Sequence, residues 1–90
     1  MIVRPKLNVI IPLYNAEKYI ERCLLSIVNQ TYENINVIVI DDGSTDRSAD
    51  IVEKIAKGNE KVQLLRQANS GVSKARNTGL SIVKSGEYVT

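Results

Sequence analysis

The sequence contains no histidine and a single cysteine, Cys23, among its 90 residues. Without histidine, a Ser-His-Asp triad, a Cys-His pair and a histidine-based metal site are all excluded. One cysteine excludes an internal disulfide. The apolar runs are strand-length, far short of the ~20 residues that a membrane-spanning helix needs. Because the sequence has no histidine, any catalytic base in this chain would be a carboxylate, lysine, tyrosine or cysteine.

Strong charge of one sign is also lacking. Twelve Lys/Arg stand against ten Asp/Glu, a net charge of +2 that is too mild to indicate a nucleic-acid partner. Neither the G-x-G-x-x-G motif of dinucleotide sites nor the G-x-x-x-x-G-K-[ST] motif of P-loops occurs. No secretory signal is visible, because Asn8 and Pro12 interrupt the apolar run that follows Arg4 and Lys6. We expect one small domain over residues 1–90.

The most informative segment is 35–46. A run of mostly β-branched residues, 35–40, stops at Asp41 and Asp42, and Gly43 follows. An apolar run without alternation is typical of a strand buried on both faces of a parallel sheet. The segment therefore predicts a central strand that ends in two carboxylates.

Strands and helices alternate along the chain, which predicts an α/β fold with a parallel, three-layer α/β/α sheet. Right-handed crossovers give the strand order 3-2-1-4, with the third helix alone on one face. The strands are expected at 7–13, 35–40, 62–66 and 88–90, and helical patterns open at Asn15, at Ser44 or Thr45, and at 69–71, the third ending at Gly86.

Apolar spacing predicts one buried stripe on each helix. Asn15 is expected to cap the first helix, and Ser44 or Thr45 the second. Cys23 is expected in the core. The predicted stripes are Ile20, Cys23, Leu24, Ile27 and Val28; Ile51, Val52, Ile55 and Ala56; and Val72, Ala75, Gly79, Leu80, Ile82 and Val83.

Asp41 and Asp42 stand where open α/β sheets bind ligands, outside the carboxyl ends of the strands. Adjacent residues leaving a strand point to opposite sides, so we expect one to brace the loops and one to face the crevice. A carboxylate accepts hydrogen bonds, which suits the imide-type N–H of uracil, thymine or guanine and disfavours cytosine and adenine. Sugar hydroxyls are the other natural partners.

Further candidates follow the first strand and open the third helix. Pro12, Tyr14 and Asn15 form the first loop, where Tyr14 is either a surface aromatic or a stacking platform. Arg76 flanks the buried stripe, and its planar fork suits a diphosphate. Asp41, Asp42 and Asp46, the clustered carboxylates, leave no convergent cage for Mg²⁺ or Mn²⁺, so no metal ligand and no catalytic residue is assigned.

Five segments together resemble family 2 glycosyltransferases of the GT-A fold, over a match from about Leu7 to the last residue. They read VIIPLYN at 9–15, SIVNQTY at 26–32, VIDDGSTD at 39–46, NSGVSKARN at 69–77 and GEYV at 86–89. The resemblance implies transfer of a sugar, usually from a UDP-sugar, with inversion. It also implies a saccharide or lipid-linked acceptor and a cytoplasmic protein, peripheral at the cytoplasmic membrane face in its full-length form.

The resemblance assigns roles to matching residues. Pro12 and Tyr14 would pack on the base and ribose, Asp42 would bind the uracil N–H, and Arg76 would lie along the nucleotide. Asn15, Asp41 and Ser44 complete the predicted nucleotide-binding set. The family's Asp-x-Asp, which binds Mg²⁺ or Mn²⁺, and its catalytic base come later than Thr90. Residues 1–90 are therefore expected to be the nucleotide-sugar-binding half, which binds nucleotide without turnover.

Two alternatives stay open. A receiver-like signalling domain would also place acidic residues at strand ends, but it needs a phosphoacceptor Asp after the third strand, where Arg66 and Gln67 stand. A non-enzymatic association fragment would use an open sheet edge, which also predicts homo-oligomers. The sequence ends inside an incipient strand, which favours a piece of a longer chain.

Overall fold

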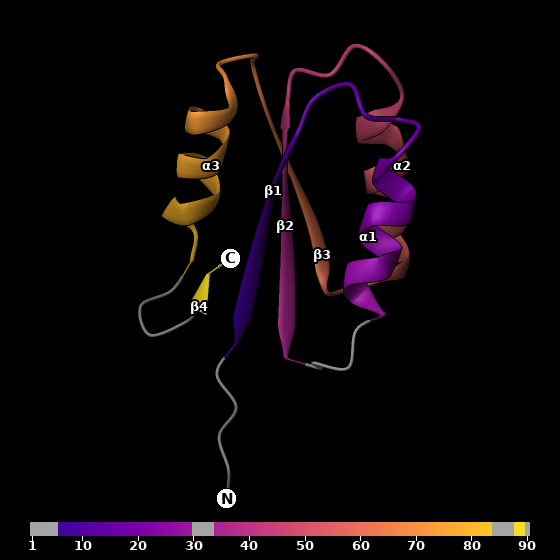
Figure 1. Cartoon of the computed structure of the whole chain (residues 1–90), viewed down its shortest axis with the longest axis vertical. Helices are drawn as coiled ribbons and strands as arrows, with labels where there is room; N and C mark the ends of the chain where they lie inside the picture. The colour runs from indigo at the N-terminus through magenta and orange to yellow at the C-terminus, as the bar shows by residue number, and fades with distance from the viewer. Residues whose placement is uncertain (1–5, 30–33, 84–87, 90) are drawn as a thin grey trace, which may run out of the picture.

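The apolar runs of the sequence form the strands of one parallel sheet in this computed structural model, which describes residues 6–29, 34–83 and 88–89 (Figure 1). The sheet has the order β3-β2-β1-β4, and each neighbouring pair is parallel. The predicted order is confirmed, with β4 represented by two residues. The strands are β1 (Leu7–Leu13), β2 (Ile35–Asp42), β3 (Val62–Gln67) and β4 (Tyr88–Val89).

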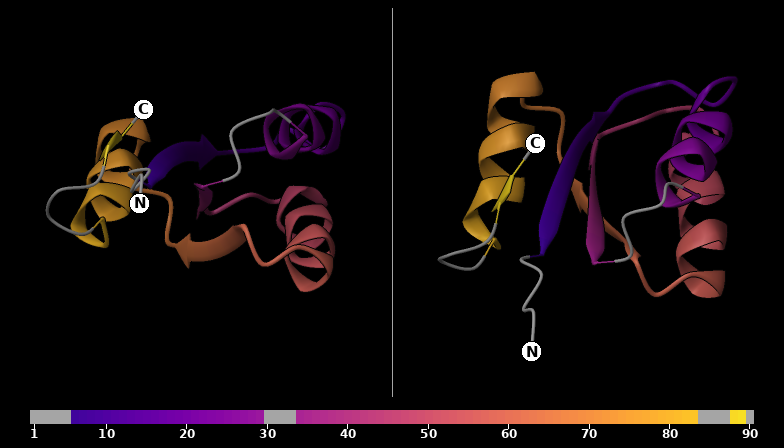
Figure 2. Two further views of the ribbon diagram at one scale, coloured as in Figure 1. Left: turned by 90° about the horizontal axis from the view of Figure 1, so that it is seen from below. Right: turned by 60° about the horizontal axis from the view of Figure 1, so that its bottom comes forward.

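Helices cover both faces of the sheet, as predicted. The helices α1 (Ile20–Val28) and α2 (Ser48–Gly58) lie side by side on one face, and α3 (Val72–Ser81) lies alone on the other (Figures 1 and 2). The helix α3 ends at Ser81, so the expected end at Gly86 is wrong. Gly86 itself, together with residues 30–32, 87 and 90 of the predicted pattern, lies outside the described residues.

The larger core fills the space between the sheet and the pair α1 and α2. Alternation along β1 and β2 sends every second side chain to this face. Leu24 of α1 and Val52 of α2 are fully enclosed, at 0% exposure. The buried members are Leu13, Ile20, Leu24, Val28, Ile35, Val37, Val39, Val52 and Val62.

The core beneath α3 is smaller. Its buried members are Ile10, Ile38, Ile40 and Ala75. Gly79 lets α3 approach β1 closely, because a Cβ placed there would lie 2.5 Å from Cγ2 of Ile10. Three of the six residues predicted for the buried stripe of α3 are exposed, namely Val72, Leu80 and Ile82. The helix contacts the sheet through its small residues and leaves its larger ones outside.

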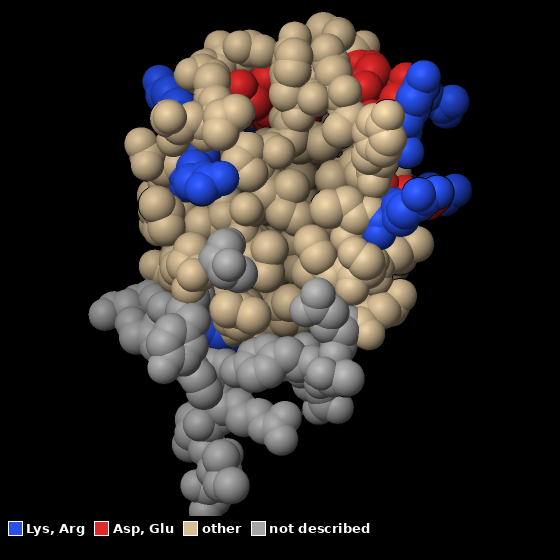
Figure 3. Space-filling model, viewed as in Figure 1, with Lys and Arg blue, Asp and Glu red and all other residues tan. Residues whose placement is uncertain are grey.

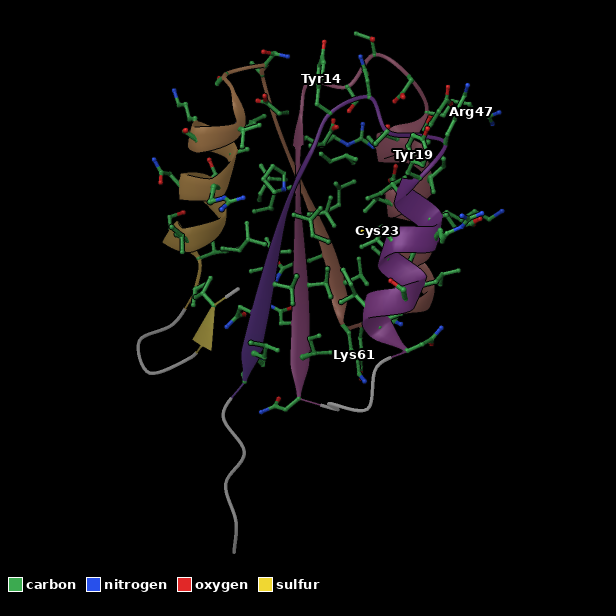
Figure 4. The ribbon with its side chains drawn as sticks, viewed as in Figure 1. Tyr14, Tyr19, Cys23, Arg47 and Lys61 are labelled. Atoms are coloured by element: carbon green, nitrogen blue, oxygen red, sulfur yellow. The ribbon has the colours of Figure 1, made fainter. Side chains whose placement is uncertain are left out.

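Cys23 was predicted to lie in the core, but it lies on α1 (Figure 4) and is exposed. The buried line of this helix is Ile20, Leu24 and Val28, each four residues from the next, with Ile27 half-buried beside it. Cys23 lies roughly a quarter turn from the centre of that line, because each residue advances about 100°. The core prediction for Cys23 is therefore wrong.

Two surfaces bear on the remaining expectations. Within the described residues, no helix is both long and apolar enough to cross a membrane. The strand β4 pairs only with Leu7 and Asn8 of β1, so the described strands leave the rest of that edge of β1 unpaired. Association through an open edge stays a prediction.

Candidate functional site

Three loops gather at the carboxyl ends of the strands, at the top of Figure 1. They are residues 14–19 after β1, 43–47 after β2 and 68–71 after β3. In the space-filling view, Asp and Glu atoms are visible at this end (Figure 3). This is the edge at which open parallel sheets bind ligands.

The first two loops are joined through Asn15, which has a positive φ of 47°. Its Oδ1 accepts hydrogen bonds from the backbone N–H of Thr45 at 2.8 Å and of Asp46 at 3.3 Å. In return, the backbone N–H of Asn15 donates to Oγ of Ser44 at 3.0 Å. The side chain of Asn15 therefore binds backbone N–H groups of the second loop, residues 43–47. The expectation that it caps its own helix is wrong, since α1 begins at Ile20.

A second set of hydrogen bonds joins these loops at the start of α2. Oδ1 of Asp46 accepts from the backbone N–H of Ser48 at 2.8 Å, and Oδ2 accepts from that of Glu17 at 3.2 Å. Oγ of Ser48 accepts from the backbone N–H of Ala16 at 2.7 Å. Burial of the Asp46 carboxyl raises its pKa, but the hydrogen bonds from Ser48 and Glu17 lower that pKa below its usual value overall.

These contacts correct the predicted cap of α2. The helix begins at Ser48, and the side chain bonded to its backbone N–H is that of Asp46. Ser44 and Thr45 instead face Asn15. Sequence patterns predict a helix cap from neighbouring residues alone. They missed this arrangement because Asn15 and its partners lie about thirty positions apart.

Asp42 joins the second strand to the third loop. It is 5% exposed, and its Oδ1 accepts from Nε2 of Gln67 at 2.9 Å and from the backbone N–H of Ser70 at 2.8 Å. Its Oδ2 accepts from the backbone N–H of Gly71 at 2.9 Å. The hydrogen bonds from Gln67 and Ser70 hold the pKa of Asp42 below its usual value against the opposing effect of desolvation. The carboxylate is therefore ionised at neutral pH.

Asp41 takes the opposite side of the strand. It is 4% exposed, and its Oδ1 accepts from the backbone N–H of Ser44 at 3.4 Å, within the turn that follows β2. The expectation that one carboxylate braces the loops fits Asp41. Asp42 braces a loop as well, and it also lines a cavity.

That cavity measures about 200 Å³ and is lined by Pro12, Leu13, Tyr14, Asp42 and Val72. Tyr14 is half exposed beside it, at the loop end of the sheet (Figure 4). The structure thus brings together the predicted residues Pro12, Tyr14 and Asp42. An aromatic face, a proline and an ionised carboxylate in one hollow suit a flat ligand that carries a hydrogen-bond donor.

Arg76 lies in a neighbouring cavity of about 270 Å³, with Ile10, Leu80 and Val89. It comes one helical turn after Val72 on α3, and Ile10 shares the α3 face of β1 with Pro12. The two cavities therefore follow one another between β1 and α3. Within the described residues, the Arg76 guanidinium makes no ion pair or hydrogen bond, so it is available to an anion.

The described residues do not fit a divalent metal. They contain no group of three Asp, Glu, Cys or His side chains that could hold an ion. Both carboxylate oxygens of Asp42 and of Asp46 already accept hydrogen bonds. The expectation that metal ligands lie elsewhere stays a prediction.

Sequence reasoning missed Gln67, Ser70 and Gly71 as partners of Asp42. A signal was present for Gln67, which is the register partner of Asp42 in the sheet. Since Asp42 and Gln67 end adjacent parallel strands on the same face, the predicted strand order alone places their side chains together. The backbone donors at 70 and 71 depend on a loop conformation in which Gly71 has a φ of 98°.

Comparison with known proteins identifies relatives of this arrangement. The chain is 47% identical over 90 residues to the glycosyltransferase GlyA of Streptococcus pneumoniae serotype 4, covering all of this chain and 13% of that protein. Among solved structures, a mannosyltransferase from Pyrobaculum calidifontis in complex with GDP-Man and Mn²⁺ is similar, with a TM-score of 0.82 and 31% identity, over 91% of this chain and 25% of that one. S. aureus TarS gives a TM-score of 0.81 and 39% identity, over 93% of this chain and 15% of that one.

The chain thus spans between about an eighth and a quarter of the length of these relatives. The family model described as glycosyl transferase family 2 matches residues 8–90, nearly the whole sequence. The Rossmann-like α/β fold is shared with GT-A glycosyltransferases, and the receiver-like alternative is set aside. The chain belongs to glycosyl transferase family 2.

Proposed function

We propose that this chain forms the donor-binding part of a glycosyltransferase that transfers a sugar from a UDP-sugar to an acceptor with inversion. The observation that carries the proposal is the ionised, buried Asp42 in a hollow beside Pro12 and Tyr14. The GDP-Man in the complex of the Pyrobaculum calidifontis mannosyltransferase supports a nucleotide-sugar donor. The acceptor is proposed to be a saccharide or a lipid-linked molecule.

The chemistry of Asp42 favours a base with an imide-type N–H. A carboxylate oxygen has two lone pairs, and within the described part of the chain Oδ2 of Asp42 accepts a single hydrogen bond, from Gly71. The remaining lone pair suits N3–H of uracil or N1–H of guanine, whereas cytosine presents an acceptor there. Tyr14 is placed to stack on the base, and Pro12 to pack against it.

The neighbouring cavity suits the diphosphate. Arg76 lies there with a guanidinium that has no partner among the described residues, and a planar fork binds phosphate oxygens in pairs. Three further residues were predicted to bind nucleotide, namely Asn15, Asp41 and Ser44. Their polar atoms described above form hydrogen bonds within and between the loops. We assign them a supporting role, in which they hold Tyr14 and Asp42 at a fixed spacing.

Turnover is proposed to need parts of the protein beyond this half. A divalent metal and a general base would act on the diphosphate and the acceptor, and the described residues offer no cage for the metal. The Mn²⁺ in the complex of the Pyrobaculum calidifontis mannosyltransferase supports a metal in the full-length enzyme. We therefore expect residues 1–90 to bind UDP without releasing it from a UDP-sugar.

Titration calorimetry of this chain with UDP, GDP, CDP and ADP tests the proposal. We expect UDP to bind most tightly and Asp42→Ala to weaken it roughly tenfold or more, since a hydrogen bond to a charged group contributes about 1.5–3 kcal/mol. Asp50→Asn, an exposed carboxylate on α2, is the matched control and should bind as the parent does. Preference for GDP would keep Asp42 and change the donor, whereas equal binding of UDP and CDP would overturn the assignment.

A further inference from the structure

A chain of side-chain hydrogen bonds connects Asp42 to the middle of α3. Nε2 of Gln67 donates to Oδ1 of Asp42 at 2.9 Å, and Oε1 of Gln67 accepts from Oγ1 of Thr78 at 2.8 Å. Gln67 and Thr78 are both half-buried. Neither is among the predicted nucleotide-binding residues, and neither lines the cavity beside Tyr14.

Chemistry fixes the direction of these hydrogen bonds. An ionised carboxylate only accepts, so Gln67 must turn its amino group toward Asp42. The amide oxygen then faces Thr78, whose hydroxyl donates to it. The same hydroxyl lies 3.0 Å from the carbonyl oxygen of Lys74, which is its alternative acceptor. The amide of Gln67 is therefore oriented from both ends.

This orientation decides which carboxylate oxygen of Asp42 stays open. Oδ1 accepts from Gln67 and from the Ser70 backbone, which occupies both of its lone pairs. Among the described residues, Oδ2 accepts only from the backbone N–H of Gly71. We propose that Gln67 and Thr78 are positioning residues that hold Asp42 with Oδ2 presented to the base, and so set the preference for an imide N–H. This inference rests on the proposed function of the site.

The surroundings make the assignment measurable. Among the described residues that line the cavity, Tyr14 is the one other titratable side chain, and α3 contributes Val72 there. Asp41 points to the opposite face of the sheet, and Arg76 lies in the neighbouring cavity. The pKa of Asp42 is lowered, first by Gln67 and then by Ser70. The ionised Asp42 carboxylate therefore stabilises the folded chain above a pH of about 4, the ordinary pKa of an Asp in the unfolded chain. This stabilisation is lost as the pH falls through the lowered pKa of the folded chain.

The experiment compares five variants with the parent chain. Gln67→Leu removes the donor, and Gln67→Glu replaces the amide by a second carboxylate. Thr78→Val removes the hydroxyl, and Thr78→Ser restores it. Gln63→Leu is the matched control, because Gln63 lies on the same face of β3 at its other end and donates to Asn36 instead. The readouts are UDP and CDP affinity between pH 5 and 8, and the titration midpoint of the Asp42 carboxyl carbon by NMR.

We expect Gln67→Leu to weaken UDP binding roughly five- to tenfold. The same variant should bring the affinities for UDP and CDP closer together and raise the titration midpoint of the Asp42 carboxyl. Thr78→Val should show a smaller change in the same direction, while Thr78→Ser and Gln63→Leu bind as the parent does. In Gln67→Glu the two carboxylates share a proton, so UDP binding should be close to the parent at pH 5 and fall as the pH rises. Between pH 5 and 8 the parent should show no such decline.

The outcomes separate the two proposals. A parent chain that binds neither UDP nor GDP would overturn the proposed function, and with it the role of Oδ2 toward a base. If Gln67→Leu leaves both the titration midpoint of the Asp42 carboxyl and the ratio of UDP to CDP affinity unchanged, the positioning role of Gln67 and Thr78 alone is overturned. If Gln67→Leu fails to fold, Thr78→Val against Thr78→Ser and the pH response of Gln67→Glu still decide the question.

Discussion

The two faces of the sheet are built differently. Toward α1 and α2 the strands present a surface that is apolar apart from Asp41 and Arg66, and nine buried side chains of the described residues fill the space. Toward α3 the buried set has four members, and the same face carries the amides of Asn8, Asn36 and Gln63 and the carboxylate of Asp42. Both cavities of the candidate site lie on this second side. The first face stabilises the fold, and the second leaves room for a ligand.

The largest expected effect sharpens this contrast with one substitution made on each side. Leu24 of α1 is fully buried, and Leu80 of α3 is 45% exposed. Leu24→Ala should lower the free energy of unfolding by about 2–5 kcal/mol, because it removes buried methyl groups and leaves a cavity. Leu80→Ala should cost less than about 1 kcal/mol. Urea unfolding followed by circular dichroism measures both, and equal losses would contradict the comparison.

A second substitution would break the close approach of α3 to the sheet. Gly79→Ala places a Cβ at 2.5 Å from Ile10 Cγ2, and overpacking of this kind costs about 1–3 kcal/mol. Gly58→Ala is the control, since no atom lies within 4 Å of its added Cβ. Thermal unfolding should show a lower midpoint for Gly79→Ala alone. In an Ile10→Ala background, which lacks Cγ2, Gly79→Ala should cost less than in the parent if the clash is the cause.

The loop contacts above the two faces give the third prediction. Asn15→Ala loses two accepted backbone hydrogen bonds and puts an alanine at a φ of 47°, for an expected loss of about 2 kcal/mol. Asn15→Gly loses the same acceptor but tolerates that φ, so its loss should be nearer ~1 kcal/mol. The difference between the two variants in chemical unfolding isolates the backbone term. Identical stabilities would mean that the φ of Asn15 carries no strain.

The smallest expected effect lies at the outer edge of the apolar face. Arg66 and Glu53 form an ion pair at 3.0 Å, with their side chains 53% and 50% exposed. Glu53→Gln should change the free energy of unfolding by less than about 0.5 kcal/mol. Unfolding in low and high salt measures it. A larger, salt-dependent loss would show that charge adds to the apolar packing on this face.

The sequence predicted the sheet well because its strands are unambiguous. The run 35–40 is apolar apart from Asn36, and β1 agrees with its predicted bounds, Leu7–Leu13. Crossover handedness then gave the strand order and the isolated position of α3. These features depend on local apolarity and on chirality, which a single sequence carries in full.

Predictions failed where distant residues decide the outcome. Asn15 has the local signature of a cap, but Thr45 and Asp46 occupy its oxygen. Val72 and Leu80 match a buried stripe by spacing, yet α3 rests on Ala75 and Gly79. Spacing identifies which side chains share a helix face, and it cannot tell how close the helix stands to the sheet or what covers its flanks.

The contacts between the first two loops also bear on the order of events in folding. They connect residues about thirty positions apart, so the backbone N–H groups of Ala16, Glu17 and Thr45 gain their partners only after two strand–helix units have docked. Hydrogen exchange at these amides would report when that docking is complete, separately from formation of the sheet. A chain with paired strands and open loops would have the fold and no site. If the proposed function holds, nucleotide that binds only the form with joined loops would shift the docking equilibrium toward that form.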